Sequence, residues 1–320
     1  MGIGEKHFEA INNYKGSKVL LICEKDKKKI KILKKKYPKI EIITDENKIY
    51  ENKDINLVSI ASYDEDHYSQ IIKSIKFNKN LIIEKPMCLK LNELHKINDL
   101  LKKNKKINIL SNLVLRVNSR FSYFKQKIDK DKIYYMEADY DWGRVHKLYE
   151  WRATQKNYSI TLGAGIHMID LAMWILNKRP ISVIAFGNNN ATKGTNFKKL
   201  SFAVYIFKFP NNVILKVTAN AASVHDHFHH LKIYEKNNSY INSYLGSYHF
   251  NSKNRFFNVN KRYPDKKNRK NLIRNFIDKM LLNKKPEFSV KDQVDLMSAC
   301  FFADQSMNSG KEIKIKYFNK

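Results

Sequence analysis

Apolar residues in the first third of the chain follow two alternating patterns. Continuous apolar runs lie within residues 17–24, 55–62 and 81–86, and such runs are typical of strands buried on both faces of a parallel sheet. Elsewhere apolar residues recur every three to four positions, which is typical of helices that cover a sheet. Asp64 is the expected N-cap of the second of these helices. The helical stripes are Ile30, Leu33 and Tyr37; Tyr68, Ile71, Ile72 and Ile75; and Leu94, Ile97, Leu100 and Leu101.

Beyond about residue 120 the pattern changes to longer runs in which apolar and polar residues alternate. This alternation predicts an open, mainly antiparallel sheet with one face packed on helices. Pro210-Asn211-Asn212 is a turn signal between two of the strands, and helical spacing returns in residues 271–283 and 292–309. The strand-like runs cover residues 133–140, 181–187, 200–209 and 213–219.

The two patterns predict an α/β fold with two domains. We expect residues 1–118 to form a Rossmann-like, dinucleotide-binding domain with a parallel sheet. Residues 119–320 are expected to form an α+β domain built on the open sheet.

The first residues have the pattern of a phosphate-binding turn that runs into a helix. Gly4 stands at the third glycine of a Gly-x-Gly-x-x-Gly fingerprint. Glu24 follows about twenty residues later, at a strand end where an acidic side chain binds the adenosine ribose. In this register the second glycine falls on Met1, and the first glycine and the opening strand fall before it. We therefore expect an opening strand upstream, because the sheet otherwise has two unpaired edges.

Glu84, Lys85 and Pro86 follow directly on an apolar strand. The carboxyl ends of parallel strands are where open α/β sheets bind ligands. A lysine that is partly buried there has a lowered pKa and can exchange protons with a substrate hydroxyl near neutral pH. A Glu-Lys-Pro turn alone is also common on solvated surfaces, so the assignment depends on its neighbours.

The order and spacing of these motifs resemble the glucose-fructose oxidoreductase and inositol dehydrogenase family, often written Gfo/Idh/MocA. The resemblance extends over nearly the whole chain, although the glycine fingerprint matches only in part. The matching positions are Gly4 with His7, Glu24, the turn Ala61 to His67, Glu84-Lys85-Pro86, Arg116, Trp151-Arg152, and Gly163 to Asp170 with His167 between them.

The resemblance implies an oxidoreductase that uses NAD or NADP and acts on a sugar, cyclitol or nucleotide sugar. It also implies that the domain of residues 119–320 binds the substrate and carries, on its sheet, the subunit interface of a homo-oligomer. Lys85 and His167 would be the catalytic residues. The other implied contacts are Gly4, Glu24, Ser62, His67, Glu84, Trp151 and Arg152 for the cofactor, and Arg116 and Asp170 for the substrate. We also expect Tyr158 at the substrate.

Three positions depart from the family pattern. Many members carry an aspartate four residues before the histidine, where this chain has Gly163. Either Lys85 with His167 suffices for the proton chemistry, or another group such as Tyr158 completes it. Ser62 and Tyr63 replace the usual threonine and proline.

Composition and charge limit the remaining classes of function. The 320 residues are 43% hydrophobic and contain no apolar run near the roughly 20 residues of a membrane span. The sequence shows no secretory signal, and Cys23, Cys88 and Cys300 are odd in number and scattered, so we expect a cytoplasmic protein. The net charge of +29 comes largely from lysines, clustered at residues 25–36 and 261–270. We favour a solvated lysine surface over a specific nucleic-acid site, because the first cluster keeps an intact apolar stripe.

His225, His227 and His229 would share one face of a strand, a spacing compatible with zinc. We favour substrate contact or a polar strand face, and expect no metal. For the whole chain, the alternative to an active dehydrogenase is a non-catalytic homologue that binds a nucleotide or sugar through a truncated cofactor site. Glu84, Lys85 and His167 favour the enzyme.

Overall fold

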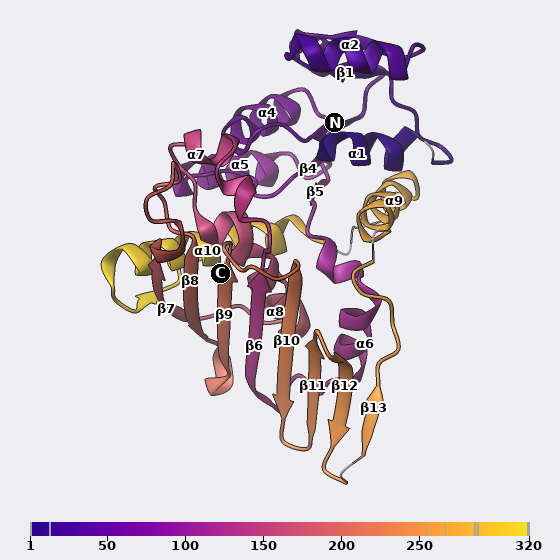
Figure 1. Cartoon of the computed structure of the whole chain (residues 1–320). Helices are drawn as coiled ribbons and strands as arrows, with labels where there is room; N and C mark the ends of the chain where they lie inside the picture. Colours follow the sequence, from indigo (N-terminus) through magenta and orange to yellow (C-terminus); the bar gives the residue numbers. More distant parts are fainter. Residues whose placement is uncertain are drawn as a thin grey trace. The chain divides into compact units, whose positions relative to one another are not determined.

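The computed structural model describes residues 2–12, 14–253, 255–265, 267–284, 286 and 288–318. The chain divides into two compact units, which Figure 1 colours along the sequence. Each unit has its own sheets and its own buried residues. Unit 1 comprises Met1–Cys88, Asn92–Asn112 and Lys266–Gln293, and unit 2 comprises Leu89–Leu91, Leu113–Asp265 and Val294–Lys320.

The described strands of unit 1 all pair in parallel. β1 (Leu21–Cys23) pairs with β2 (Glu41–Ile43). In a second sheet, β4 (Asn80–Ile83) lies between β3 (Leu57–Ile60) and β5 (Ile109–Ser111). The parallel pairing and the full burial of the three apolar residues of β4 confirm the predicted sheet class. In the described chain β1 and β3 each have one edge that no strand pairs.

The predicted helical stripes supply part of the core of unit 1. Leu33, Ile71 and Leu94 are buried on three of its helices. The N-cap expected at Asp64 is wrong, because Asp64 already belongs to the helix and the extended Tyr63 precedes it. Asp64 is instead an acidic residue in the first turn, where the helix dipole favours it. The helices are α1 (Ile3–Asn12), α2 (Lys27–Lys36), α3 (Asn47–Glu51), α4 (Asp64–Lys76), α5 (Leu91–Lys103) and α9 (Asn268–Leu281).

Helix α9 belongs to unit 1, whereas the predicted boundary at residue 118 puts it in the second domain. The Tyr14 hydroxyl, just after α1, donates a hydrogen bond to Asp278 of α9 at 2.6 Å. The Arg274 guanidinium lies 4.9 Å from the centroid of the Tyr14 ring. These contacts join segments more than 250 residues apart, which periodicity in the sequence does not reveal.

Unit 2 contains a sheet of nine described strands in the order β13-β12-β11-β10-β6-β9-β8-β7-β14. Its pairs are antiparallel except β6 with β9. Buried and partly exposed residues alternate along β8, β9 and β10, as predicted for one covered face. The strands are β6 (Ile133–Asp141), β7 (Ser182–Asn188), β8 (Phe202–Lys208), β9 (Ile214–Asn220), β10 (Phe228–Glu235), β11 (Asn238–Ser243), β12 (Gly246–Asn251), β13 (Phe256–Asn258) and β14 (Ile313–Lys314).

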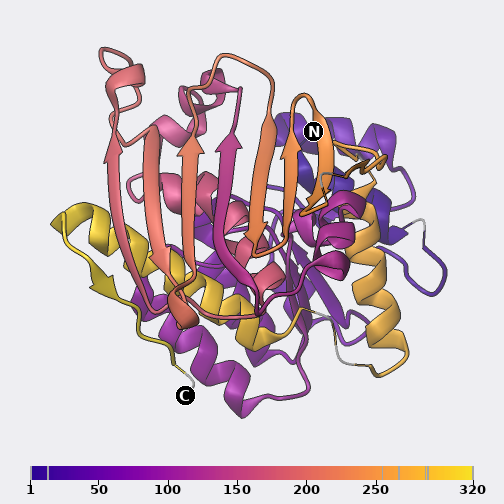
Figure 2. The ribbon, with the colours of Figure 1, turned by 90° about the horizontal axis from the view of Figure 1, so that it is seen from below.

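Helices cover one face of this sheet. Figure 2 looks onto the sheet, with the yellow helix α10 behind it. The predicted turn at Pro210–Asn212 forms between β8 and β9, with φ of 63° at Asn211. None of the described helices is long and apolar enough to cross a membrane. The helices of unit 2 are α6 (Ser119–Lys127), α7 (Trp151–Thr154), α8 (Ile166–Leu176) and α10 (Val290–Ser309), with short helical turns at Val114–Val117, Val145–Leu148, Thr161–Gly165 and Asn190–Thr192.

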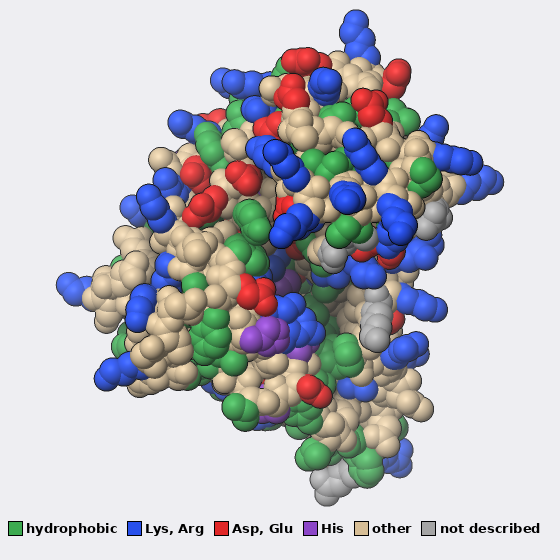
Figure 3. All heavy atoms as spheres, turned by 45° about the horizontal axis from the view of Figure 1, so that its top comes forward, with side chains coloured by type: hydrophobic (Ala, Val, Ile, Leu, Met, Phe, Trp, Pro, Cys, Tyr) green, Lys and Arg blue, Asp and Glu red, His purple; other side chains and the backbone are tan. Residues whose placement is uncertain are grey.

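Lysine and arginine side chains spread widely over the face drawn in Figure 3. On α2, Leu33 is buried and the lysines of the helix are exposed. This confirms that the lysines between residues 27 and 36 form the solvated side of an amphipathic helix.

Candidate active site

Glu84 stands at the C-terminal end of β4 and is the centre of a polar cluster in unit 1. Its Oε1 lies 3.1 Å from His7 Nε2 and 3.7 Å from Arg269 Nε, and it accepts a hydrogen bond from Asn112 Nδ2. Burial alone would raise the pKa of Glu84, but the bonds and charges of these neighbours outweigh it and lower that pKa to about 2. The carboxylate is therefore ionised and fixed in orientation at neutral pH.

Lys85 follows Glu84, is half-buried, and forms a cis peptide bond with Pro86. His67 holds the backbone next to it, with Nδ1 2.7 Å from the Pro86 carbonyl oxygen and Nε2 3.3 Å from that of Ser62. The His67 ring is fully buried. We expect His67 to position these two turns, and any influence on a cofactor passes through their backbone rather than through direct contact.

Gly4, Glu24 and Ser62 lie near the starts of helices in unit 1. A Cβ added at Gly4 would lie 3.5 Å from the Ala61 Cβ, an ordinary contact distance. Glu24 Oε1 accepts hydrogen bonds from the backbone N–H groups of Lys25 and Asp26, at 2.9 and 3.0 Å. The Ser62 hydroxyl donates to Gln70 Oε1 at 2.7 Å. The predicted second glycine falls on Met1, outside the described residues.

In unit 2, His167 of α8 belongs to a cluster of aromatic rings. Its ring centroid lies 5.7 Å from that of Tyr140 and 6.1 Å from that of His229, with both pairs nearly perpendicular. Tyr140 stacks on His229 at 4.4 Å, and its hydroxyl lies 3.0 Å from His227 Nε2. Tyr263 contacts His229 Nδ1 through its hydroxyl at 2.5 Å.

His227 and His229 are uncharged near neutral pH. Burial, with the charge of Arg144, lowers the pKa of His227 to about 4. Burial lowers the pKa of His229 well below its usual value. Burial also raises the pKa values of Tyr140 and Tyr263. The cluster therefore presents neutral groups that both donate and accept hydrogen bonds.

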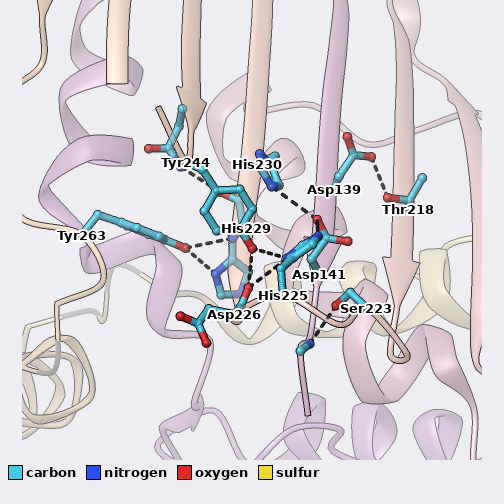
Figure 4. Close-up of polar contacts among 12 residues, drawn as sticks. Asp139, Asp141, Thr218, Ser223, His225, Asp226, His229, His230, Tyr244 and Tyr263 are labelled. Carbon is cyan, nitrogen blue, oxygen red and sulfur yellow. Dashed lines mark hydrogen bonds and ion pairs between the residues drawn. The ribbon is translucent and has the colours of Figure 1, made fainter. Parts of the chain in front are cut away.

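The expectation that three histidines share a strand face is wrong for His225 and His227, which both precede β10. β10 begins at Phe228, so His225 precedes the strand and lies beside Tyr244, with its Nδ1 2.5 Å from the hydroxyl. Its Nε2 lies 3.7 Å from Asp141. Figure 4 shows His225 with Tyr244 and Asp141, and it also shows the contact between His229 and Tyr263. Among the described residues, no group of three or more His, Cys, Asp or Glu side chains is arranged to hold a metal ion.

Arg116 and Asp170, which were both expected at the substrate, form an ion pair with each other. Arg116 Nε lies 3.1 and 3.0 Å from the two carboxylate oxygens, and Nη2 lies 2.6 Å from Oδ1. The Asp170 side chain is 1% exposed and that of Arg116 10%. This two-pronged pair fixes α8 to the Val114–Val117 turn, so we assign both residues to positioning the helix that carries His167.

The remaining predicted residues of unit 2 lie in two aromatic contacts. The Arg152 guanidinium is 4.2 Å from the Trp151 ring centroid and 5.0 Å from that of Trp142. Tyr158 packs edge-on against Phe197 at 5.2 Å and lies next to Gly163. A cation held between two indole rings has a defined orientation.

The sequence interpretation missed four residues of these clusters. Asn112 and Tyr140 stand at strand ends, a position that is the one available signal for them. Arg269 and Tyr263 come from distant segments without any motif.

Two family sequence models match the chain. Residues 1–112 match the model described as "Oxidoreductase family, NAD-binding Rossmann fold". Residues 129–240 match "GFO/IDH/MocA C-terminal domain". Together these matches span more than half of the chain and confirm the resemblance inferred from the motifs.

Solved structures share this fold. Myo-inositol 2-dehydrogenase from Lactobacillus plantarum has a TM-score of 0.84 and 19% identity, covering 98% of this chain and 96% of that one. Scyllo-inositol dehydrogenase from Lactobacillus casei, with bound NAD(H) and scyllo-inositol, has a TM-score of 0.84 and 16% identity, with coverage of 98% and 96%. At these identities the likeness is one of fold.

A curated relative with the name of an oxidoreductase is YteT of Bacillus subtilis (strain 168). It is 26% identical over 192 residues, which cover 53% of this chain and 42% of YteT. The match thus spans less than half of the length of that relative.

Proposed function

Because this chain belongs to the GFO/IDH/MocA oxidoreductase family, we propose that it is a dehydrogenase that uses NAD or NADP. Its proposed substrate is the CH–OH group of a sugar, a cyclitol or a nucleotide sugar. The observation that carries the proposal is the end of β4, where Lys85 is half-buried beside the fixed carboxylate of Glu84. The proposal rests on this position because open α/β sheets bind ligands at strand ends.

The residues of unit 1 fit a dinucleotide. Glu24 follows β1 with one carboxylate oxygen fixed by two backbone N–H groups, an arrangement that suits hydrogen bonds from ribose hydroxyls. Gly4, in the first turn of α1, faces the side chain of Ala61, whose Cβ lies 3.5 Å from where a Cβ of residue 4 would be. We assign cofactor contact to Gly4, Glu24, Ser62 and Glu84 of this unit, and to Trp151 and Arg152 of unit 2. The choice between NAD and NADP stays open, since Lys29 Nζ lies 4.0 Å from Glu24 Oε2.

The chemistry assigned to this chain is proton transfer and orientation. When bound, the nicotinamide cofactor supplies the acceptor or donor of the hydride. Lys85 takes the proton of the reacting hydroxyl during oxidation and returns it during reduction. Glu84, ionised and held by His7 and Asn112, orients the neighbouring backbone. His167 is the partner acid or base.

Unit 2 supplies the contacts proposed for the substrate. Tyr140, His227 and His229 offer neutral oxygen and nitrogen atoms around His167. A carbohydrate hydroxyl both donates and accepts hydrogen bonds, so such groups suit it better than fixed charges do. Arg116 and Asp170 act behind this surface by holding α8.

The proposal includes a cytoplasmic homo-oligomer that associates through the open face of the sheet in unit 2. Phe186 on β7 is 55% exposed there and pairs across the strands with the partly exposed Val204 on β8. Ile184 and Ile206 form the adjacent partly exposed pair. A continuous apolar patch of this kind marks a surface for association.

A second candidate function is a non-catalytic homologue that binds a nucleotide or a sugar. The observation that favours it is the separation of the described parallel strands into two sheets, with β1 and β3 unpaired on one edge. The two candidates differ in turnover, because both bind a ligand and the dehydrogenase alone reduces NAD or NADP.

The experiment measures two quantities on the purified chain. Calorimetry gives the affinities for NAD and NADP, and absorbance at the reduced-nicotinamide band gives turnover on a panel of cyclitols, sugars and nucleotide sugars. The dehydrogenase predicts cofactor binding together with turnover of at least one panel member. Cofactor binding without turnover supports the second candidate. If calorimetry shows that neither NAD nor NADP binds, the dehydrogenase is contradicted, and if the panel compounds do not bind either, both candidates are contradicted.

A further inference from the structure

The segment from Ile160 to Met173 is buried at every position except Gly163 and His167, which are partly exposed. These two residues are four positions apart in a continuous helical stretch made of Thr161–Gly165 and α8. Residues at this spacing share one helix face. The open face of this stretch is therefore the one that carries both His167 and Gly163.

Tyr158 fills the space beside Gly163. A Cβ placed on Gly163 would lie 2.9 Å from the Tyr158 hydroxyl oxygen and 3.2 Å from each of two ring carbons. Any side chain at position 163 would thus push the tyrosine ring away. On its other side the ring packs edge-on against Phe197, which is fully buried. Glycine at 163 and the phenol at 158 therefore form a matched pair.

Hydrogen-bonding side chains lie beside this face, and the charges of Arg144 and Arg152 are also close enough to act on Tyr140. The Tyr140 ring lies 5.7 Å from the His167 ring, and the Tyr140 hydroxyl lies 3.0 Å from His227 Nε2. Tyr158 is itself close enough to raise the pKa of the Tyr140 phenol, after the larger effect of burial. The phenol of Tyr158 thus belongs to the same group of side chains as His167.

We propose that the Tyr158 hydroxyl contacts the substrate beside His167, and that Gly163 is the residue that admits it. The proposal rests on the proposed function and adds a specificity-determining residue to it. The phenol donates one hydrogen bond to a substrate hydroxyl and accepts one from it, and it undergoes no covalent change. A side chain added at 163 would remove this contact, because its Cβ collides with the Tyr158 ring.

The first test removes the hydroxyl alone. Tyr158→Phe keeps the ring and its packing on Phe197, so the melting temperature should stay unchanged. The kcat/KM for the panel substrate that the parent oxidises best should fall by about ten- to a hundredfold, because one hydrogen bond to the substrate is lost. Tyr134→Phe is the matched control, since Tyr134 is 57% exposed on β6, and it should retain the parent values.

The second test uses the matched pair. Gly163→Asp should lower the melting temperature and kcat/KM, because its Cβ collides with the Tyr158 ring. Tyr158→Ala combined with Gly163→Asp removes the collision and places a carboxylate on the same face, so the double variant should melt higher than Gly163→Asp. The change in melting temperature is also measured for Tyr158→Ala alone. If the change in the double variant equals the sum of the changes in Gly163→Asp and Tyr158→Ala, the pairing is overturned.

Binding measurements separate this inference from the function on which it rests. The dissociation constants of panel compounds are measured by calorimetry for the parent, Tyr158→Phe and Tyr134→Phe. If the parent shows no turnover and Tyr158→Phe binds a panel compound more weakly than the parent does, the tyrosine contact is supported and the dehydrogenase is contradicted. Turnover and binding that are equal in Tyr158→Phe and the parent overturn the contact and leave the dehydrogenase standing. A parent that binds no panel compound overturns both.

Discussion

His7 Nε2 lies 3.1 Å from Glu84 Oε1, which joins the first helix of the chain to the end of β4. Nδ1 of the same ring lies 2.8 Å from the Ser59 hydroxyl on β3. A neutral ring that accepts from Ser59 donates to Glu84, and a protonated ring donates to both. Either state keeps the Glu84 carboxylate in place beside Lys85, so His7 supports the site without reaching the substrate.

This arrangement predicts a loss of stability in acid. The pKa of Glu84 is lowered from 4.5 to about 2 in the folded chain. The ionised carboxylate therefore stabilises the fold above pH 4.5, and this contribution disappears as the pH falls through about 2. Its size is on the order of 3 kcal/mol. Glu84→Gln should lose stability at neutral pH and show a flatter acid limb in urea unfolding. Glu41→Gln, at an exposed position on β2, is the control, and equal acid limbs in Glu84→Gln and the parent would contradict this reading.

Asp304 predicts the opposite pH dependence, in which the free energy of unfolding falls as the pH rises. Burial raises its pKa from 3.8 to about 6, although hydrogen bonds from Ser159 and Thr161 oppose the shift. Its contribution is complete below pH 3.8 and is lost as the pH rises through about 6. Asp304→Asn should therefore unfold at a higher urea concentration than the parent at pH 8 and lose the pH dependence between 4 and 6. A variant less stable than the parent at pH 8 would show that the ionised carboxylate is needed.

His167→Asn should lower kcat by roughly a hundredfold, the typical contribution of one general acid or base. The amide keeps a polar group of similar size beside Tyr140, so the affinity for the cofactor should not change. His95→Asn, on the exposed side of α5, is the matched control for steady-state kinetics. If His167→Asn and His95→Asn have the same kcat, His167 is a packing residue of the ring cluster.

Association through the open sheet face is tested by Phe186→Glu. A carboxylate at this exposed apolar position should break the oligomer, since it would have to be buried in the interface. Light scattering after size-exclusion chromatography should then give the mass of one chain. Leu245→Glu, at a position that is 88% exposed, should keep the parent mass. An unchanged mass for Phe186→Glu would place the interface elsewhere.

Local patterns in the sequence predicted the elements well, because burial follows periodicity. Leu33, Ile71 and Leu94 face the core as their spacing indicates, and β8 and β9 alternate as expected. His225 shows the limit, because period two predicts a shared face only where a strand exists and β10 begins three residues later.

The candidate site was predicted in its residue types and less well in its contacts. Arg116 and Asp170 are 54 positions apart, and nothing local indicates that they form an ion pair with each other. Tyr158 and Gly163 are close in sequence, but the space that the glycine leaves depends on the wide turn at Thr161–Gly165. Tertiary contacts of this kind carry no periodic signal.

Lys85→Met is the most direct test of the central claim, that Lys85 moves the proton of the reacting hydroxyl. Methionine keeps most of the volume of the side chain and removes the ionisable group. The kcat on a substrate that the parent oxidises should fall by at least about a thousandfold, while calorimetry should give nearly the same affinity for NAD as in the parent. A Lys85→Met variant that turns over the same substrate at the parent rate would contradict the catalytic assignment.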